Sequence, residues 1–194
     1  MPKPTAKAAT LDFKEVQDLV DQFVRKMPPG VYQQNLLADH PLLAKILALP
    51  ELDQCAIATH VAQHLTNLYK RRNEHQAKHG SENPWITMGG LPVSLLLQRL
   101  LMKKLPFSAE QLSSFCRFLC AGGADSFTVA PVVGALIKGL ERGVLTPADP
   151  TLQAVANALA KSGSTTNVPL ATRFTAALKD AAPVADTRSP EQPL

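Results

Sequence analysis

The chain has 194 residues, of which 45% are hydrophobic and 19% charged, and its formal net charge is +4. This length fits one domain or one short array of repeats, and the apolar content excludes general disorder. The small excess of 20 Lys and Arg over 16 Asp and Glu is too weak to indicate a nucleic-acid binder. Leu and Ala outnumber the β-branched and aromatic residues, and this balance favours helices.

The chain begins with an arm and one predicted helix. Residues 1–9 contain Lys, Pro and Ala without an apolar core, so we expect a mobile arm and no secretory signal. Asp12 is followed three residues later by Glu15, a capping-box pattern that predicts a helix start. Apolar residues at helical spacing continue to Met27, where a Pro-Pro-Gly sequence ends the helix.

Two further helices are predicted before the middle of the chain. Residues 36–49 form a shorter apolar segment, and Pro41 indicates a fresh start inside it. Residues 51–78 form the longest predicted helix. The next twelve positions, 79–90, are rich in Gly, Ser, Asn and Pro, which predicts a loop that holds the only tryptophan, Trp85.

Residues 91–121 carry the clearest pattern and predict two helices joined as an antiparallel hairpin with facing apolar stripes. Lys103 and Lys104 end the first helix, where cations oppose the negative end of the helix dipole. Ser108 and Gln111 form a capping box that opens the second helix. Such a pair cannot bury both stripes alone, so further helices must flank it.

Three more helices are predicted in the C-terminal part. Thr128 or Ser126 caps a helix that ends at Gly143. A second helix opens after Thr146, where Pro and Asp follow in the order expected of a first turn. A final helix covers residues 169–181.

We therefore predict an all-α fold of seven to eight helices in a single domain over residues 10–182, with a disordered tail at 183–194. Helix openings recur after about 38 residues, close to a HEAT or armadillo unit, and favour stacked antiparallel hairpins in a short HEAT-like array. A compact helical bundle is the open alternative. No apolar segment is long enough to span a bilayer, and we expect a cytoplasmic protein.

One segment allows a comparison with a known family. Residues 95–108, with the sequence LLLQRLLMKKLPFS, and the helical pattern that follows them resemble the helical-repeat region of large bacterial proteins grouped with the molybdate-metabolism regulator, which often carry a WGR domain. The resemblance covers about residues 91–160. It implies a helical-repeat scaffold and places no catalytic residue on this chain.

Four histidines form the strongest candidate for metal chemistry. His60, His64, His75 and His79 are two pairs at i, i+4 spacing on one flank of the predicted long helix, mostly on its solvent side. A zinc site needs a third or fourth protein ligand, which the helix does not supply clearly. A metal-binding or metal-sensing helical protein is therefore the alternative function, and no cofactor is predicted.

The three cysteines, Cys55, Cys116 and Cys120, cannot all pair within the chain and lack a CxxC spacing. Cys116 and Cys120 are four residues apart on a predicted apolar stripe. We expect both to pack in the core as small, unreactive hydrophobic side chains.

Packing explains every strongly patterned residue, and no catalytic motif is present, so we predict a non-catalytic helical module that binds another protein. The predicted partner-binding residues are Arg71, Arg72, Trp85, Lys103 and Lys104, an aromatic side chain within a basic rim that suits an acidic protein. In the opposing interpretation, Trp85 packs beneath its own loop and the cations only solvate helix ends. The sequence leaves the partner's identity and the oligomeric state open.

Overall fold

The computed structural model describes residues 11–26, 41–81, 84–162 and 164–181, and these residues contain eight α-helices, one short 3-10 helix and no strand. The all-α prediction is confirmed. The predicted arm at 1–9 and tail at 183–194 lie outside the described residues. The helices are α1 Phe13–Lys26, α3 Pro41–Leu47, α4 Glu51–His79, α5 Pro84–Leu101, α6 Ala109–Cys120, α7 Val129–Glu141, α8 Pro150–Lys161 and α9 Asn167–Asp180, and η1 is Gly123–Asp125.

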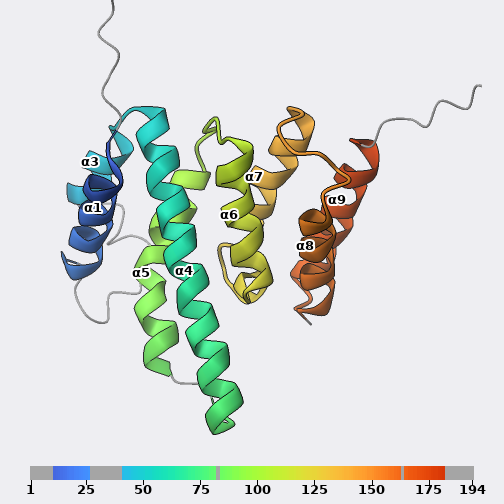
Figure 1. Ribbon diagram of the computed structural model, residues 1–194, viewed down its shortest axis with the longest axis horizontal. Coiled ribbons are helices and arrows are strands. Elements are labelled where there is room, and N and C mark those ends of the chain that lie inside the picture. The colour runs from blue at the N-terminus through green and yellow to red at the C-terminus, as the bar shows by residue number, and fades with distance from the viewer. Residues whose placement is uncertain (1–10, 27–40, 82–83, 163, 182–194) are drawn as a thin grey trace, which may run out of the picture.

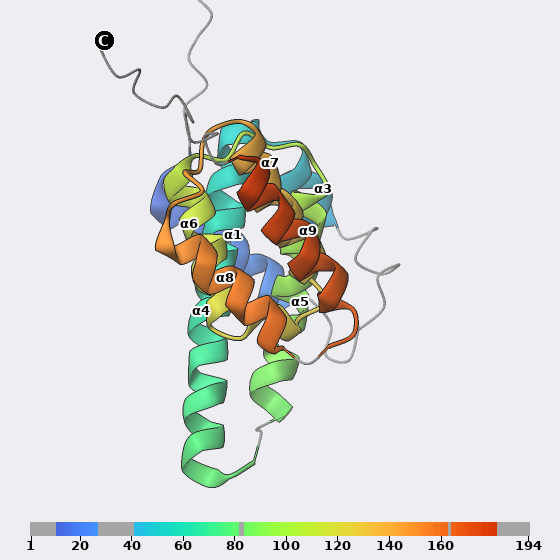
Figure 2. The ribbon, with the colours of Figure 1, turned by 90° about the vertical axis from the view of Figure 1, so that its right-hand side faces the viewer.

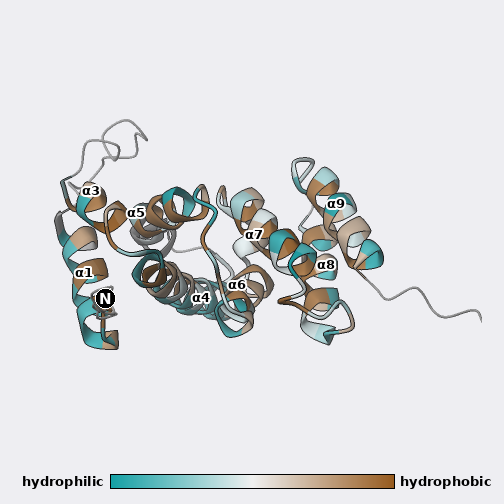
Figure 3. Ribbon diagram, turned by 90° about the horizontal axis from the view of Figure 1, so that it is seen from above, coloured by the Kyte–Doolittle hydropathy of each residue, from teal (hydrophilic) through white to brown (hydrophobic). Residues whose placement is uncertain are grey.

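The helices follow one another as pairs along the longest axis of the molecule (Figure 1). Seen from above, α1, α4, α6 and α8 form one row, and α3, α5, α7 and α9 form a second row beside it (Figure 3). From α4 to α9, the helices pack on their partners across the rows and on neighbours along their own row, as α6 does with α7, α4 and α8. This arrangement is an open succession of helix pairs and not a closed bundle.

The pairing differs from the predicted hairpin over residues 91–121. The main partner of α5 is α4, and α6 packs chiefly on α4, α7 and α8. The connection from α5 to α6 spans residues 102–108 and is not a tight turn, and Leu105 and Phe107 within it are buried. This connection crosses from one row of helices to the other, so α5 and α6 belong to successive pairs.

The long helix α4 and the lower half of α5 extend together beyond the other helices (Figure 2). The predicted loop at 79–90 is wrong in extent, because α5 already begins at Pro84, and proline suits the first turn of a helix. Gly90 lies inside α5 and packs so closely on α4 that an added Cβ would lie 2.4 Å from the Leu68 Cδ2 atom. A glycine at this position therefore reflects close helix packing.

Both predicted capping boxes are confirmed. The Asp12 backbone N–H donates to the Glu15 carboxylate over 2.8 Å, and the Glu15 N–H donates back to the Asp12 carboxylate over 2.8 Å. Ser108 and Gln111 make the same reciprocal pair of bonds before α6. These contacts satisfy backbone donors that a helix start leaves without partners.

The other predicted helix ends are close to the observed ones. Gly143, which follows the C-cap residue Arg142 of α7, has a φ of 66°, a left-handed conformation that glycine adopts without strain. Asp149 caps α8 by accepting a hydrogen bond from the Thr151 N–H over 2.8 Å. Thr128 occupies the N-cap position of α7 but makes no side-chain cap; its hydroxyl instead pairs with that of Ser126 at 2.8 Å.

The apolar core runs without interruption through the successive pairs. Its largest fully buried side chains include Phe23 of α1, Phe115 and Phe118 of α6, and Phe174 of α9. Among the described helices, none is both long enough and apolar enough to cross a membrane.

Candidate functional site

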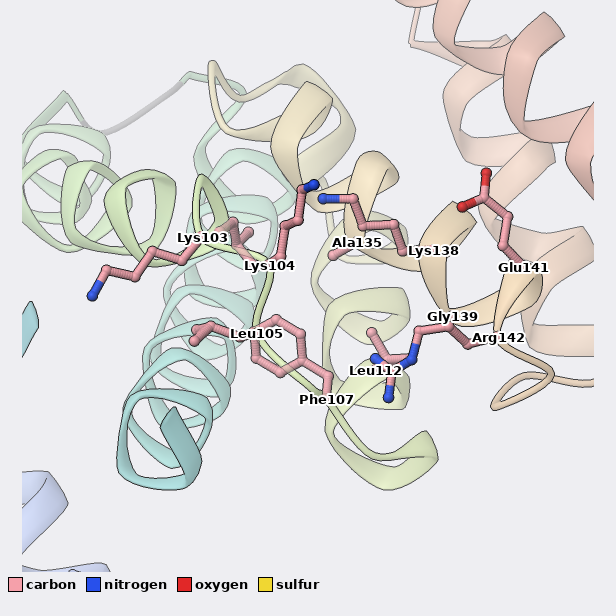
Figure 4. A pocket seen from close by; sticks show the side chains of 11 residues that line it. Lys103, Lys104, Leu105, Phe107, Leu112, Ala135, Lys138, Gly139, Glu141 and Arg142 are labelled. Atoms are coloured by element: carbon pink, nitrogen blue, oxygen red, sulfur yellow. The ribbon is translucent and has the colours of Figure 1, made fainter. Parts of the chain in front are cut away.

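A pocket of about 290 Å³ opens where the α5–α6 connection meets α7 (Figure 4). Its apolar lining is formed by Leu101, Leu105, Phe107, Leu112, Ala135 and Gly139. Its charged lining is formed by Lys103, Lys104, Lys138, Glu141 and Arg142. We call these eleven residues the basic groove.

Core packing fixes the apolar floor of the basic groove. Leu105, Phe107 and Leu112 are buried, and the Phe107 ring meets the Phe115 ring edge-on with 5.0 Å between centroids. At Gly139 an added Cβ would lie 2.5 Å from the Leu112 Cδ1 atom, so the backbone of α7 sits directly on α6. The floor is therefore preformed and does not need a ligand to hold its shape.

The charged side chains of the groove are poorly neutralised. Lys104, Lys138 and Arg142 are exposed, and none of them forms an ion pair with another described residue. Lys104 and Lys138 point toward one another, whereas Glu141 points away from the pocket (Figure 4). Unpaired cations above an apolar floor attract negatively charged groups more strongly than the same cations on a flat, fully hydrated surface.

The negative end of the α7 dipole offsets part of this positive charge. Lys138 lies in the last turn of α7, and Arg142 follows directly after it. The dipole contributes roughly half an elementary charge at that end, compared with a full charge on each cation. Together with Lys104, the two side chains keep a net positive potential over the groove.

Two predicted site residues belong to this region. Lys104 lies in the basic groove with its side chain exposed. Lys103 lines the pocket but its ammonium group is engaged elsewhere, since Lys103 Nζ donates to the Leu47 carbonyl oxygen over 2.6 Å. Lys104 is therefore the predicted residue with its charge still available.

The predicted arginines lie at the other end of α4. Arg71 follows Glu51 by 20 residues, which corresponds to about 30 Å along a helix axis at roughly 1.5 Å per residue. The start of α4 is close to the Leu47 carbonyl that accepts the hydrogen bond from Lys103. The structure thus separates Arg71 and Arg72 from the two lysines, so these four cations do not border one surface.

Arg72 is held against its own helix and the turn that follows α6. Its guanidinium carbon lies 4.5 Å from the Tyr69 ring centroid, a cation–π geometry. An added Cβ at Gly122 would lie 3.0 Å from the Arg72 Nη2 atom. The neighbouring Asn73 donates from Nδ2 to the Ala121 carbonyl oxygen over 3.0 Å. These contacts join α4 to the end of α6.

Trp85 lies in the first turn of α5, next to the connection from α4, and not in a loop over the predicted hairpin. Its side chain lies outside the described residues, so both interpretations of it stay predictions. Arg71 and Arg72 lie in the second half of α4, and the backbone of Trp85 lies in the first turn of α5.

Sequence reasoning missed Lys138 and Arg142. Both lie about one helix pair further along the chain than Lys104, and cations at the end of a helix are expected on dipole grounds alone. Nothing in the local pattern indicated that the end of α7 meets the connection after α5. Only the packing of α5 on α7 brings these charges together.

The histidine flank of α4 is partly covered. Phe13 of α1 meets the His60 ring edge-on at 5.4 Å, and both His60 and His64 are half-buried. Burial lowers the pKa of each below its ordinary value of 6.5; the neighbouring positive groups, His64 beside His60 and Arg71 beside His64, lower it further, and Asp21 raises it. The expectation that most of these four histidines face solvent is therefore wrong, because His60, His64 and His75 are half-buried and His79 alone of the four is exposed.

The second histidine pair is separate from the first. His75 and His79 have ring centroids 4.5 Å apart, and His75 Nδ1 lies 3.2 Å from the Ser81 carbonyl oxygen. Eleven residues separate His64 from His75, about 16 Å along the helix at roughly 1.5 Å per residue. In the parts of the chain that the structure describes, no three His, Cys, Asp or Glu side chains are grouped to hold a metal ion.

The cysteines differ in their surroundings. Cys116 is buried, and burial with a nearby Cys120 raises its pKa to about 12. Burial likewise raises the pKa of Cys55 to about 11. Cys120 is exposed, which corrects the prediction that it packs in the core; it is the last residue of α6.

No family model, no curated protein and no solved structure matches this chain. The resemblance of residues 91–160 to the molybdate-regulator group therefore stays a prediction.

Proposed function

We propose that this protein is a non-catalytic helical module that binds another protein through the basic groove. The observation that carries the proposal is the combination of a preformed apolar floor with exposed cations that no described residue neutralises. An acidic surface with an apolar side chain at its centre complements both features. The arrangement of helices in pairs supplies a rigid support, because the floor is part of the core.

Charge complementarity makes the binding depend on salt. Exposed ion pairs are screened at ionic strengths that leave apolar burial unchanged. We expect the partner to associate more slowly and less tightly as salt rises. A residual affinity from the apolar floor should persist, since its side chains stay available.

A photo-reactive amino acid in place of Ala135 tests the proposal in the native cell. Ala135 is half-buried in the pocket lining, so a probe there lies beside whatever enters the groove. We expect a specific covalent adduct with a protein in this background. The adduct should disappear when Lys104→Glu and Lys138→Glu are introduced together, because the rim then repels an acidic partner.

Lys161→Glu is the matched control for this experiment. Lys161 is an exposed lysine in the last turn of α8, as Lys138 is in the last turn of α7, so the two substitutions cost similar helix-dipole energy. The adduct should persist in the control. An adduct that survives the double substitution, or none from the unaltered groove, would overturn the proposal.

A further inference from the structure

The two sides of the basic groove differ in chemistry. In Figure 4 the flexible ammonium groups of Lys104 and Lys138 point toward one another on one side of the pocket. The planar guanidinium of Arg142 is drawn apart from them, next to Leu112 of the apolar floor. A ligand that uses the whole pocket must therefore place negative charge at both positions and apolar surface against the floor.

Resting on the proposed function, we propose that the occupant is a short acidic segment of the partner protein in which an apolar side chain lies between two carboxylates. One carboxylate is held between Lys104 and Lys138, which act as point charges. The second pairs with the guanidinium of Arg142, whose parallel N–H groups match the two oxygens of a carboxylate. The apolar side chain packs on Phe107 and Leu105.

The size of the pocket favours a protein segment, and not a complete small molecule, as its occupant. Pockets for drug-sized molecules usually begin at roughly 300 Å³. The volume of about 290 Å³ is at that lower limit and admits one or two side chains of a partner. A free phosphate or a single carboxylate would leave the apolar floor uncovered and would gain nothing from it.

The two sides of the groove differ in charge. Lys104 and Lys138 together carry two positive charges, whereas Arg142 carries one. Glu141, the only acidic residue of the groove lining, points away from the pocket (Figure 4). The stronger of the two carboxylate contacts is therefore the one at Lys104 and Lys138.

Fluorescence anisotropy with three labelled peptides tests this inference on the full chain. The probes are short peptides with the cores Glu-Leu-Leu-Glu, Gln-Leu-Leu-Gln and Glu-Ser-Ser-Glu. We expect the first to bind about tenfold or more tightly than either of the others, since each control loses one contribution worth roughly 1.4 kcal/mol or more. Equal binding of the Glu-Ser-Ser-Glu peptide would overturn the apolar requirement, and equal binding of the Gln-Leu-Leu-Gln peptide would overturn the carboxylate requirement.

Variants locate the binding and rank its two sides. Lys104→Glu with Lys138→Glu should weaken the Glu-Leu-Leu-Glu peptide by about tenfold or more, and Arg142→Gln by less, whereas Lys161→Glu should leave it unchanged. Inorganic phosphate and vesicles of anionic lipid serve as competitors. If phosphate or the vesicles displace the peptide at a concentration as low as that of the peptide, the groove is a general anion site and the inference is overturned.

The outcome is distinguishable from a failure of the proposed function. A cellular adduct through position 135 with no peptide binding leaves the protein-binding module standing and overturns the acidic segment. Selective peptide binding without any cellular adduct supports the recognition chemistry and overturns the proposed function.

Discussion

The ammonium group of Lys103 donates a hydrogen bond to the carbonyl oxygen of Leu47 over 2.6 Å. Leu47 is the last residue of α3, and the final carbonyls of a helix lack partners within it. The bond also places a cation at the negative end of the α3 dipole. It joins the connection after α5 to the helix at the N-terminal end of the array.

Replacing Lys103 by Met should lower the free energy of unfolding by about 1 kcal/mol, because a charged hydrogen bond is lost. The adjacent Lys104→Met should change stability by less than about 0.5 kcal/mol, since Lys104 is exposed. Urea denaturation of both variants measures the difference. Equal effects would show that the bond to Leu47 contributes nothing to stability.

Two glycines of α7 give opposite predictions for one substitution. Gly139→Ala forces a methyl group to within 2.5 Å of the Leu112 Cδ1 atom, and overpacking of this kind costs about 1–3 kcal/mol. At Gly134 nothing lies within 4 Å of an added Cβ, so Gly134→Ala should stabilise α7 by up to about 1 kcal/mol. Thermal unfolding of the pair should show shifts of opposite sign, and a matching sign would contradict the described packing of α7 on α6.

Local sequence patterns predict much of this fold. The remainder depends on packing between segments that are distant in the sequence. The capping boxes of Asp12 with Glu15 and of Ser108 with Gln111 lie within four residues each, so the sequence alone reveals them. The pairing of α5 with α4 depends on which apolar faces meet across long separations, and no local pattern encodes it.

The same limit explains the candidate site. Lys104 was predicted because it stands in a visible cationic cluster. Lys138 and Arg142 join it only through the packing of α7 against α5, more than 30 residues away in sequence. The sequence pattern groups Arg71 and Arg72 with Lys104, but the length of α4 and its pairing with α5 hold them apart.

The thiols should react in a fixed order. Cys120 is exposed, whereas Cys55 and Cys116 are buried with pKa values raised to about 11 and about 12. Thiolates are the reactive species, so iodoacetamide at mild alkaline pH should modify Cys120 first and the others only after unfolding. Mass spectrometry of digested protein assigns the sites, and early modification of Cys116 would contradict its burial.

Stability should fall as the pH drops below about 6.5. Burial holds the pKa of His60 and His64 below that ordinary value in the folded protein, so the unfolded chain takes up these protons first and is favoured by acid. Above 6.5 both states hold neutral histidines and this contribution is constant. Urea denaturation from pH 7.5 to 5 should show the decline, reduced in His60→Gln and His64→Gln but retained in His79→Gln, since His79 is exposed. If the three variants lose stability equally as the pH falls, His60 and His64 are not the source of the decline.

Amide chemical-shift mapping during titration with the Glu-Leu-Leu-Glu peptide tests the central claim most directly. The account predicts shifts concentrated at residues 101–112 and 135–142, the two segments that line the basic groove. Residues 70–78 at the far end of α4 should be unaffected. Shifts confined to residues 70–78 and the start of α5, with none in the groove, would contradict it.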